Sequence, residues 1–497
     1  MGMVLNTNIG AIQAQRALTE SRKDMEKAME RLSTGKRING AADDAAGLAM
    51  VERMNTQIRG LTMATRNAND GISLIRTVEN ALVEVSGMLQ RMRVLAVQSA
   101  NDTNTATERA FANNELNQLQ LEISRVSLNT RYNGAQVLNG SFSGKSLQVG
   151  TESGESISFS IANIESSKLG AFVEEGLAKG AILGNTPPDN GTSANDLTIA
   201  GKKSQIIDVE LNDTAQEVAK KINAVAGGTQ VTAEARTFAH LYTTAAAPSG
   251  DQINRRISFS DSAGNATATA AFTLTSNDVS DAVQKINAIS TTTGVQASAT
   301  SDYKVLLTKQ NGDDIRVTNT SPSTGDDAIK IRTVGINGVS EFGDERALAA
   351  AGVDNDAVTV RGNIRLTSDY DFTVTDHSTP NFFTAGAKAA ELTNISSVDV
   401  LTRITSTDAL AVIDGAIATV SSYRGGLGTL ENRLDYTVSN LMKVTEYTTG
   451  ARSRIADADF AAETSKLAKA QVLQQAAASM LSQANASTDT VLQLLRG

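Results

Sequence analysis

The sequence predicts an α+β protein in which terminal helices form a coiled-coil or helical-bundle rod and β-rich outer domains are inserted in the middle of the chain. All five prolines lie between Pro187 and Pro380, so both flanks can hold long helices. Apolar residues in the flanks recur at steps of three and four, the period of an amphipathic helix. The middle is rich in Thr, Ser, Asn and Asp and contains short alternating segments, which favours strands.

The first flank predicts three helices. The first carries an apolar stripe made of Ala11, Ala14, Leu18, Ser21, Met25, Ala28 and Leu32. A loop at 33–40 follows, and Asp43 or Asp44 can cap the second helix. The stripe from Val51 to Ala96 predicts a helix about 70 Å long at roughly 1.5 Å per residue. A third helical stretch runs from Ala112 to Val126.

The second flank mirrors the first. A long stripe runs from Ile413 to Leu441, and three glycines at 425, 426 and 428 are expected to weaken it locally. We expect a break near Thr448–Gly450, followed by a last helix with its stripe between Leu467 and Ala484. Such seams need a partner to bury them, and the simplest partner for the N-terminal helices is the C-terminal set.

The two extreme ends carry no charge. Residues 1–15 and 471–488 lack charged side chains, and the second stretch has too many Gln, Ser and Asn to cross lipid. A solvated helix normally shows charges on its outer face, so these ends suggest contact on every side within an assembly. A weakly ordered tail is the alternative. The two interpretations are compatible if the ends are disordered in the monomer and helical in the polymer.

The middle contains hairpin-like segments at 131–165 and one internal repeat. The segment Val218–Ala224 (VAKKINA) is echoed by Ala282–Ala288 (AVQKINA) at a spacing of 64, and the segments that follow also correspond. This pattern predicts two copies of a small strand–helix–strand unit. A repeat of this size indicates duplicated architecture rather than a catalytic site.

Composition excludes several classes of function. The net charge of −9 argues against a nucleic-acid partner. The chain has no Cys and only two distant His residues, so neither a thiol nucleophile nor a zinc site is expected. Lys36 follows Gly35, but a phosphate loop also requires a Gly five residues before Gly35, where Glu30 stands, and a Ser or Thr after the Lys, where Arg37 stands. The chain has no Sec-type signal and no run of 18 apolar residues, and we expect no membrane insertion, no cofactor, no metal and no catalytic set.

Several blocks in the flanks resemble bacterial flagellin, the subunit of the flagellar filament. Near the N-terminus these are Asn6 to Ile9, Arg31 to Ala49, Gln90 to Gln98 and Asn129 to Gly134. Near the C-terminus they are Gly425 to Arg433, Arg454 to Glu463 and Leu492 to Arg496. The match covers roughly 1–170 and 400–497, with its blocks in the family's order, and the middle belongs to the part that varies between flagellins.

The resemblance implies a layered organisation. It comprises an inner-core helix at 1–42, rod helices and hairpins at 43–175, an outer variable region with the repeat at 176–400, a rod helix at 401–452 and a second inner-core helix at 453–497. The implied function is a non-enzymatic subunit that polymerises through its paired ends for swimming motility. The candidate inner-core assembly residues are Ile9, Ile12, Leu18, Met25, Leu32, Leu467, Leu473, Met480, Leu481 and Leu494.

The resemblance also implies a route and partners. Flagellins leave the cell unfolded through the flagellar type III apparatus and act outside it, which agrees with the missing signal peptide and the missing Cys. The implied partners are further copies of the chain, an export chaperone, the filament cap and hook-associated proteins. An animal Toll-like receptor senses many flagellins, and Arg91, Leu95 and Glu115 occupy the matching positions, while Val94 stands where related sequences often have Glu.

Three alternatives remain open from the sequence. A hook–filament junction protein shares the terminal helices. A coiled-coil signalling protein, such as a chemoreceptor hairpin, would lack a β-rich insert of this length. An enzyme hidden in the middle would need a catalytic set that the sequence does not display.

Overall fold

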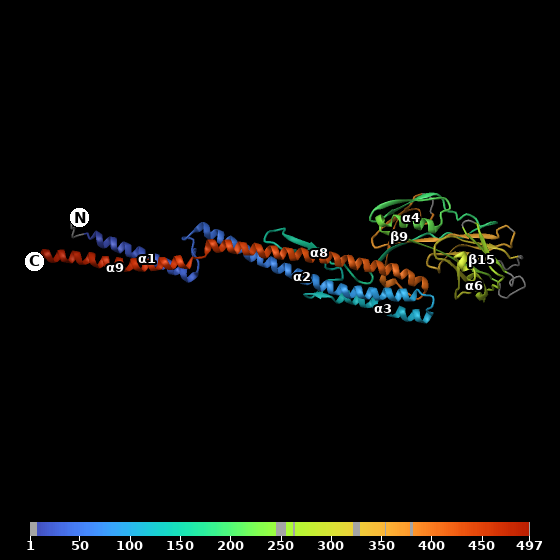
Figure 1. Cartoon of the computed structure of the whole chain (residues 1–497), viewed down its shortest axis with the longest axis horizontal. Coiled ribbons are helices and arrows are strands. Elements are labelled where there is room, and N and C mark those ends of the chain that lie inside the picture. Colours follow the sequence, from blue (N-terminus) through green and yellow to red (C-terminus); the bar gives the residue numbers. More distant parts are fainter. Residues whose placement is uncertain are drawn as a thin grey trace. The chain divides into compact units, whose positions relative to one another are not determined.

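The computed structural model describes residues 7–244, 255–261, 264–321, 329–352, 354–377 and 381–496, with side chains described as far as Ser487. The chain divides into two compact units. The first unit comprises Met1–Arg76, Gly144–Ser160 and Gly428–Gly497, and the second comprises Thr77–Ser143 and Ile161–Leu427. Helices occupy both ends of the chain and strands fill its middle, so the predicted α+β class is confirmed (Figure 1).

Five long helices make up the flanks: α1 (Ile9–Thr34), α2 (Ala45–Ser99), α3 (Ala106–Asn129), α8 (Arg403–Ala456) and α9 (Phe460–Arg496). Of the two predicted caps for α2, Asp44 is the one that acts, because its Oδ1 accepts the Gly47 N–H at 2.8 Å. Thr105 and Glu108 form a capping box at the start of α3. The predicted stripe of α2 is buried from Ile72 to Ala96, with Val78, Val85 and Leu89 fully inside.

Helix α8 differs from its prediction in where it ends. It continues through Gly425, Gly426, Gly428 and Gly450, and the expected break near Thr448–Gly450 is wrong. Burial of Leu427, Leu434 and Leu441 on one face offsets the cost of the glycines, roughly 1 kcal/mol each. The chain turns instead at Asp457–Asp459, where Asp459 accepts the N–H groups of Ala461 and Ala462 and caps α9.

By length and composition alone, α8 would be able to cross a membrane. The core helix of a soluble protein passes the same test. In α8 the apolar side chains of Val412, Ile413, Ala416 and Val420 are buried inside the second unit. Part of the apolar stretch of α8 therefore packs against protein.

In the first unit a hairpin lies on α2. It is formed by β3 (Lys145–Gln148) and β4 (Ser156–Phe159). Asn67 donates its side-chain N–H to the Gln148 carbonyl at 3.0 Å. A Cβ at Gly60 would lie 2.7 Å from Thr151, and one at Gly71 would lie 2.4 Å from Leu147. Glycine at these two positions therefore permits the close approach of hairpin and helix.

The second unit holds the remaining strands, which pair antiparallel among the described residues. The ladders are a hairpin, a five-stranded sheet, a branched eight-stranded sheet and a four-stranded sheet. The hairpin is β1 (Arg131–Tyr132) and β2 (Ala135–Gln136). The five-stranded order is β11 (Ala266–Ala268), β10 (Ile257–Ser260), β14 (Ile315–Asn319), β17 (Ala357–Val360) and β6 (Ile182–Gly184). The four-stranded order is β20 (Gly386–Ala389), β19 (Thr373–Asp376), β7 (Asn195–Ala200) and β8 (Ser204–Val209).

The eight-stranded sheet is built around one long strand. Its main path is β12 (Gln296–Ala299), β13 (Val305–Lys309), β9 (Val231–Tyr242), β18 (Asn363–Ser368), β5 (Gly170–Glu175) and β21 (Glu391–Asn394). β15 (Ile329–Val334) branches from β9 and pairs with β16 (Glu341–Leu348). Short helices α4 (Ala215–Ala224), α5 (Ala226–Thr229), α6 (Ser280–Asn287) and α7 (Ser290–Thr293), with the 3-10 turn η1 (Ile395–Ser397), complete the second unit.

The two copies of the sequence repeat fold alike. In the first copy, the Asn223 side chain at the end of α4 exchanges two 2.8 Å hydrogen bonds with the backbone of Ala233 in β9. In the second copy, Asn287 makes the same pair of 2.8 Å bonds with Ala297 in β12. Strands β18 and β19 complete the sheets of the first copy, as β13 and β14 complete those of the second. The second copy is therefore inserted between β9 and β18 of the first.

Candidate assembly surface on the terminal helices

Helices α1 and α9 pack side by side and antiparallel in the first unit (Figure 1). The buried residues of their seam are spaced by seven, and all but Glu463 are small: Ala14, Ser21 and Ala28 on α1, and Glu463, Ala470 and Ala477 on α9. Small side chains let the two backbones approach closely, and the spacing of seven keeps them on one face. The Ser21 hydroxyl donates to the Ala470 carbonyl at 2.8 Å, and the Asn8 amide donates to the Ala484 carbonyl at 3.0 Å.

The larger apolar residues flank this seam on one side. Leu18, Met25 and Leu32 of α1 are half-buried, as are Leu467 and Leu481 of α9. Each residue turns the helix by 100°. Leu18, Met25 and Leu32 therefore lie 40–80° around the axis of α1 from Ala28, all on the same side of it. Five of the ten predicted inner-core residues therefore already contact the partner helix within one chain.

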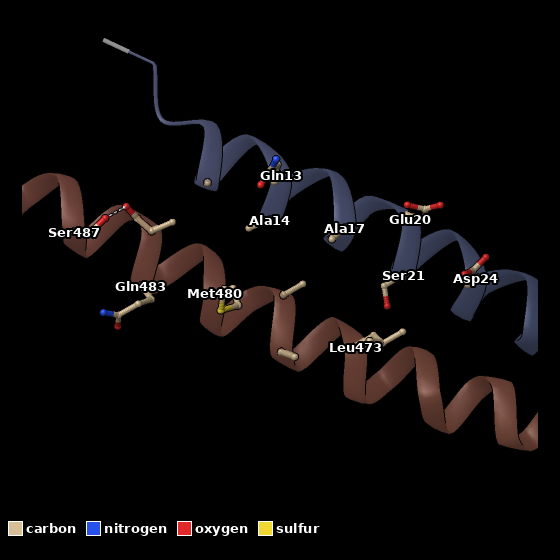
Figure 2. Close-up of a pocket in the computed structure, with 14 residues that line it drawn as sticks. Gln13, Ala14, Ala17, Glu20, Ser21, Asp24, Leu473, Met480, Gln483 and Ser487 are labelled. Carbon is tan, nitrogen blue, oxygen red and sulfur yellow. Dashed lines mark hydrogen bonds between the residues drawn. The ribbon is translucent and has the colours of Figure 1, made fainter. Parts of the chain in front are cut away.

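On the other side of the seam the two helices leave an open groove of about 670 Å³. Figure 2 shows Ala14, Ala17 and Ser21 of α1 lying above Leu473 and Met480 of α9. Leu473 is 48% exposed and Met480 is 65% exposed. Most other lining residues are Ala, Gly, Ser or Gln, and Glu20 and Asp24 are the charged members among the residues that line it. The groove therefore presents two large, partly exposed apolar side chains between small residues.

Exposed apolar side chains continue around the pair. Ile9, Ile12 and Val472 are 59%, 57% and 65% exposed. Of the predicted residues, Ile9, Ile12, Leu473 and Met480 thus face outward, while the side chain of Leu494 lies outside the described residues. The described residues of the predicted inner-core set therefore all lie on the α1–α9 pair. Some are half-buried beside the seam, and the others are exposed on its surface.

A cluster of charges closes the seam at its inner end. Asp43 pairs with Lys27 at 2.8 Å, and Arg31 pairs with Glu463 at 3.2 Å. The hydrogen bond from Lys27, supported by the N–H groups of Asn39 and Gly40, lowers the pKa of Asp43 to about 2. Lys466 and Arg31 likewise lower the pKa of Glu463. The Arg31–Glu463 pair fixes the register of α1 against α9, whereas the Lys27–Asp43 pair joins α1 to the loop that precedes α2.

Backbone contacts hold the same end. The Arg37 N–H donates to the Ala456 carbonyl at 2.7 Å, and the Ala458 N–H donates to the Gly35 carbonyl at 3.0 Å. Gly35 adopts a positive φ of 67°, which favours glycine and ends α1. The loops that follow α1 and precede α9 are therefore joined by two long-range hydrogen bonds.

The three candidate receptor residues behave differently from one another. Arg91 of α2 and Glu115 of α3 form a bidentate ion pair at 2.7 and 3.1 Å on the exposed face of the second unit. The Arg91 hydrogen bond lowers the pKa of the Glu115 carboxyl. Leu95 is only 2% exposed, so it packs inside the unit and is not on the same surface.

Sequence reasoning missed the importance of the small residues. The predicted inner-core residues are the large apolar members of the helical stripes. The small members of the same stripes form the seam: Ala14, Ser21, Ala28, Ala470 and Ala477. The spacing of seven between small residues in both helices was the available signal. The Arg31–Glu463 pair joins residues more than 400 positions apart, and the Lys27–Asp43 pair joins residues across a loop. No local sequence pattern indicates either pair.

The chemistry-bearing residues form no catalytic or metal arrangement in the described part of the chain. No group of three or more His, Asp or Glu side chains that could hold a metal ion occurs among the described residues. His240 Nδ1 lies 2.6 Å from Glu341, and His377 Nε2 lies 2.7 Å from the Thr198 hydroxyl, so the two histidines have separate partners.

Comparison with known proteins gives the family. The model of the bacterial flagellin N-terminal helical region matches residues 5–143, and that of the C-terminal helical region matches 410–495. The flagellin hook IN motif matches 196–246, the first copy of the repeat. The chain is 34% identical to the B-type flagellin of Pseudomonas aeruginosa and 32% identical to flagellin B of Vibrio anguillarum, in both cases across the whole of each chain.

Similar solved structures include FliC from Burkholderia pseudomallei, with a TM-score of 0.30 and 17% identity over 73% of this chain and 99% of that one. A hook-associated protein 3 from Legionella pneumophila has a TM-score of 0.34 and 12% identity over 82% and 98%. These scores are too low to choose between the two classes, whereas the full-length sequence matches are to flagellins. The chain belongs to the bacterial flagellin family and is a structural subunit of the flagellar filament.

Proposed function

We propose that the α1–α9 pair is the surface through which one subunit contacts the next in the filament. The observation that carries this proposal is the open apolar groove between Leu473 and Met480 of α9 and the small residues of α1. Burying a large apolar side chain stabilises a contact by about 1.5–3 kcal/mol, so partly exposed groups such as these favour association. The α9 wall of the groove lies in the uncharged stretch 471–488, so burying that wall desolvates no ion, and the charged groups of the groove, Glu20 and Asp24, lie on the α1 wall.

The subunit role is structural and non-enzymatic in this proposal. Each contact joins one face of a subunit to a different face of the next, so growth continues helically instead of closing a ring. The residues of the pair would lose further conformational freedom on assembly, at a cost of roughly 1–2 kcal/mol per ordered residue. Neighbouring subunits offset that cost, which makes growth on an existing end faster than nucleation.

The layered organisation predicted from the sequence is part of the same proposal. The inner-core segments are 1–42 and 453–497, the rod segments are 43–175 and 401–452, and the outer region is 176–400. By resemblance to the family, the chain is secreted through the type III apparatus to the outside of the cell. An export chaperone, the filament cap and hook-associated proteins are its expected partners.

Seeded polymerisation tests the proposed surface. Met480→Lys places a charge in the groove without disturbing the buried seam, and we expect elongation from seeds to stop because the charge would have to be desolvated. Val339→Lys is the matched control, since Val339 is 73% exposed in the second unit and should leave elongation unchanged. Electron microscopy of the filaments and light scattering supply the rates.

Two outcomes would contradict the proposal. If Met480→Lys elongates at the wild-type rate, the groove is not an assembly surface. If the wild-type chain forms only short caps that stop after a ring or two, the hook–filament junction alternative replaces the filament subunit.

A second candidate function is receptor recognition by the exposed Arg91–Glu115 pair. We propose that an animal Toll-like receptor contacts these two side chains and that Leu95 acts only by packing beneath them. The ion pair holds both groups in a fixed geometry on the surface. Binding of the monomer to a receptor ectodomain should weaken in Arg91→Ala and Glu115→Ala but not in Arg125→Ala, which removes the similar Arg125–Glu122 pair of α3. Equal binding by all three variants would rule this surface out.

A further inference from the structure

A second hollow, of about 290 Å³, adjoins the groove at the inner end of the α1–α9 pair. Asp24 and Leu473 line both hollows, which places them side by side. Four cationic side chains line the second one, Lys27, Arg31, Lys466 and Lys469, against two carboxylates, Asp24 and Glu463. We call this arrangement the cationic socket.

The carboxylates within the chain do not pair with every N–H donor of the socket. Asp43 holds Lys27, and Glu463 holds Arg31 and Lys466, with N–O distances between 2.8 and 3.2 Å. Lys469 is exposed and makes no ion pair with any described residue. The Nε of Arg31 is buried and has no hydrogen-bond partner in the described part of the chain. A carboxylate entering from outside would meet an unpaired ammonium beside the groove.

The outer face of α1 carries the complementary groups. Glu26 and Glu30 lie two residues on either side of the buried Ala28, so at 100° per residue they point away from the seam. Both are exposed, and neither forms an ion pair with a described residue. Like charges at i and i+4 repel slightly, and although Arg22 and Lys23 lie one turn before Glu26, no ion pair occupies either carboxylate in the described structure.

The two carboxylates and the socket also lie at the same height along the α1 axis. Glu26 and Glu30 occupy the same turns of α1 as Lys27 and Arg31, while they face a different direction. Two copies with the same polarity, displaced sideways, would therefore bring the outer face of one opposite the socket of the other. Such a contact is heterologous and propagates, as filament growth requires.

We propose that the cationic socket of one subunit receives Glu26 and Glu30 from the outer face of α1 of a second copy. This inference rests on the proposed function, in which the α1–α9 pair is the assembly surface. It adds a specific charge contact that sets the lateral register of neighbouring subunits, whereas the apolar groove supplies non-directional burial.

Charge reversal tests the contact with the full-length chain. In Lys469→Glu, elongation from seeds of the same variant should fall about tenfold or more, because like charges then face each other. Glu26→Lys with Glu30→Lys should show a similar loss. Combining the three substitutions restores the opposite-charge arrangement and should restore most of the wild-type rate. Lys220→Glu, an exposed change in α4 of the second unit, is the control and should elongate normally.

Salt supplies an independent measurement. Wild-type elongation should slow as salt is raised, since ions screen exposed charge pairs, and Lys469→Gln should flatten this dependence. If the triple variant elongates no better than Lys469→Glu, the pairing of these faces is wrong. If Lys469→Glu elongates normally while Met480→Lys does not, the socket is excluded but the assembly surface stands. Normal elongation by both variants would overturn both proposals.

Discussion

The α1–α9 pair and the outer sheets bury their side chains in opposite ways. The second unit buries Phe238, Phe272, Phe382 and Phe383 at 1–2% exposure, in cores shared by several sheets. The α1–α9 pair buries small residues and leaves Met480 and Val472 each 65% exposed. The outer sheets are thus complete within one chain, whereas the helix pair retains apolar surface for a neighbour.

Deletion of residues 471–497 should separate the behaviour of the α1–α9 pair from that of the outer sheets more than any other change. It removes one wall of the groove and the whole uncharged stretch 471–488, so polymerisation should be abolished. The outer sheets share no residue with the deleted segment and should keep their thermal transition. Electron microscopy and calorimetry measure the two properties, and filaments formed by the truncated chain would show that the helix pair is dispensable.

Core truncation should show the opposite pattern. Phe238→Ala removes a fully buried ring from the cluster with Leu306 and Val334 and should lower the free energy of unfolding of the outer region by about 3–5 kcal/mol. Leu473→Ala, at a site 48% exposed in the monomer, should change monomer stability by about 1 kcal/mol or less.

The matching measurements are chemical denaturation of each monomer and seeded elongation. Leu473→Ala should slow elongation while Phe238→Ala should not, provided the latter is assayed below its transition. A large loss of monomer stability in Leu473→Ala would mean that the groove is already filled in the monomer.

Acid should weaken the packing of α1 in the first unit. The folded pKa values of Asp43 and Glu463 lie below their ordinary values of 3.8 and 4.5, and that of Asp43 is about 2. Because both are depressed, the stability they contribute is present above the ordinary values and is lost as pH falls from about 4.5 towards about 2. Hydrogen exchange of α1 should increase in this window.

A variant pair isolates the cause of the acid effect. Asp43→Asn should flatten the pH dependence of α1 exchange, whereas Glu52→Gln, an exposed carboxylate of α2, should leave it unchanged. An unaltered pH profile in Asp43→Asn would show that the Lys27–Asp43 pair does not hold α1 in place.

Glycine replacements in α2 should give the smallest effects. A Cβ added at Gly87 would meet no described atom within 4 Å, so Gly87→Ala should stabilise the helix by about 1 kcal/mol. Gly71→Ala should fail to do so, because its Cβ would lie 2.4 Å from Leu147 in the β3–β4 hairpin. Equal gains in thermal stability would mean that the hairpin is not docked on α2.

Local patterns predicted the helices well where burial follows periodicity. The α2 stripe from Ile72 to Ala96 is buried as its spacing indicates, because one face of a straight helix must meet its partner. The end of α8 was misplaced, since Gly450 has a low helix propensity yet packing carries the helix on to Ala456. Propensity is a local preference, and burial of Leu434 and Leu441 overrides it.

The sequence by itself determined the class of the fold, the pairing of the two ends, the repeat and the family, because each depends on periodicity or on blocks of residues in order. The tertiary structure was needed for the side chains whose burial periodicity leaves open. It buried Leu95, exposed Met480, and joined Arg31 to Glu463 across 432 positions. It also completed the first copy of the repeat with β18 and β19, beyond the second copy. These outcomes depend on contacts between distant segments, which local sequence does not encode.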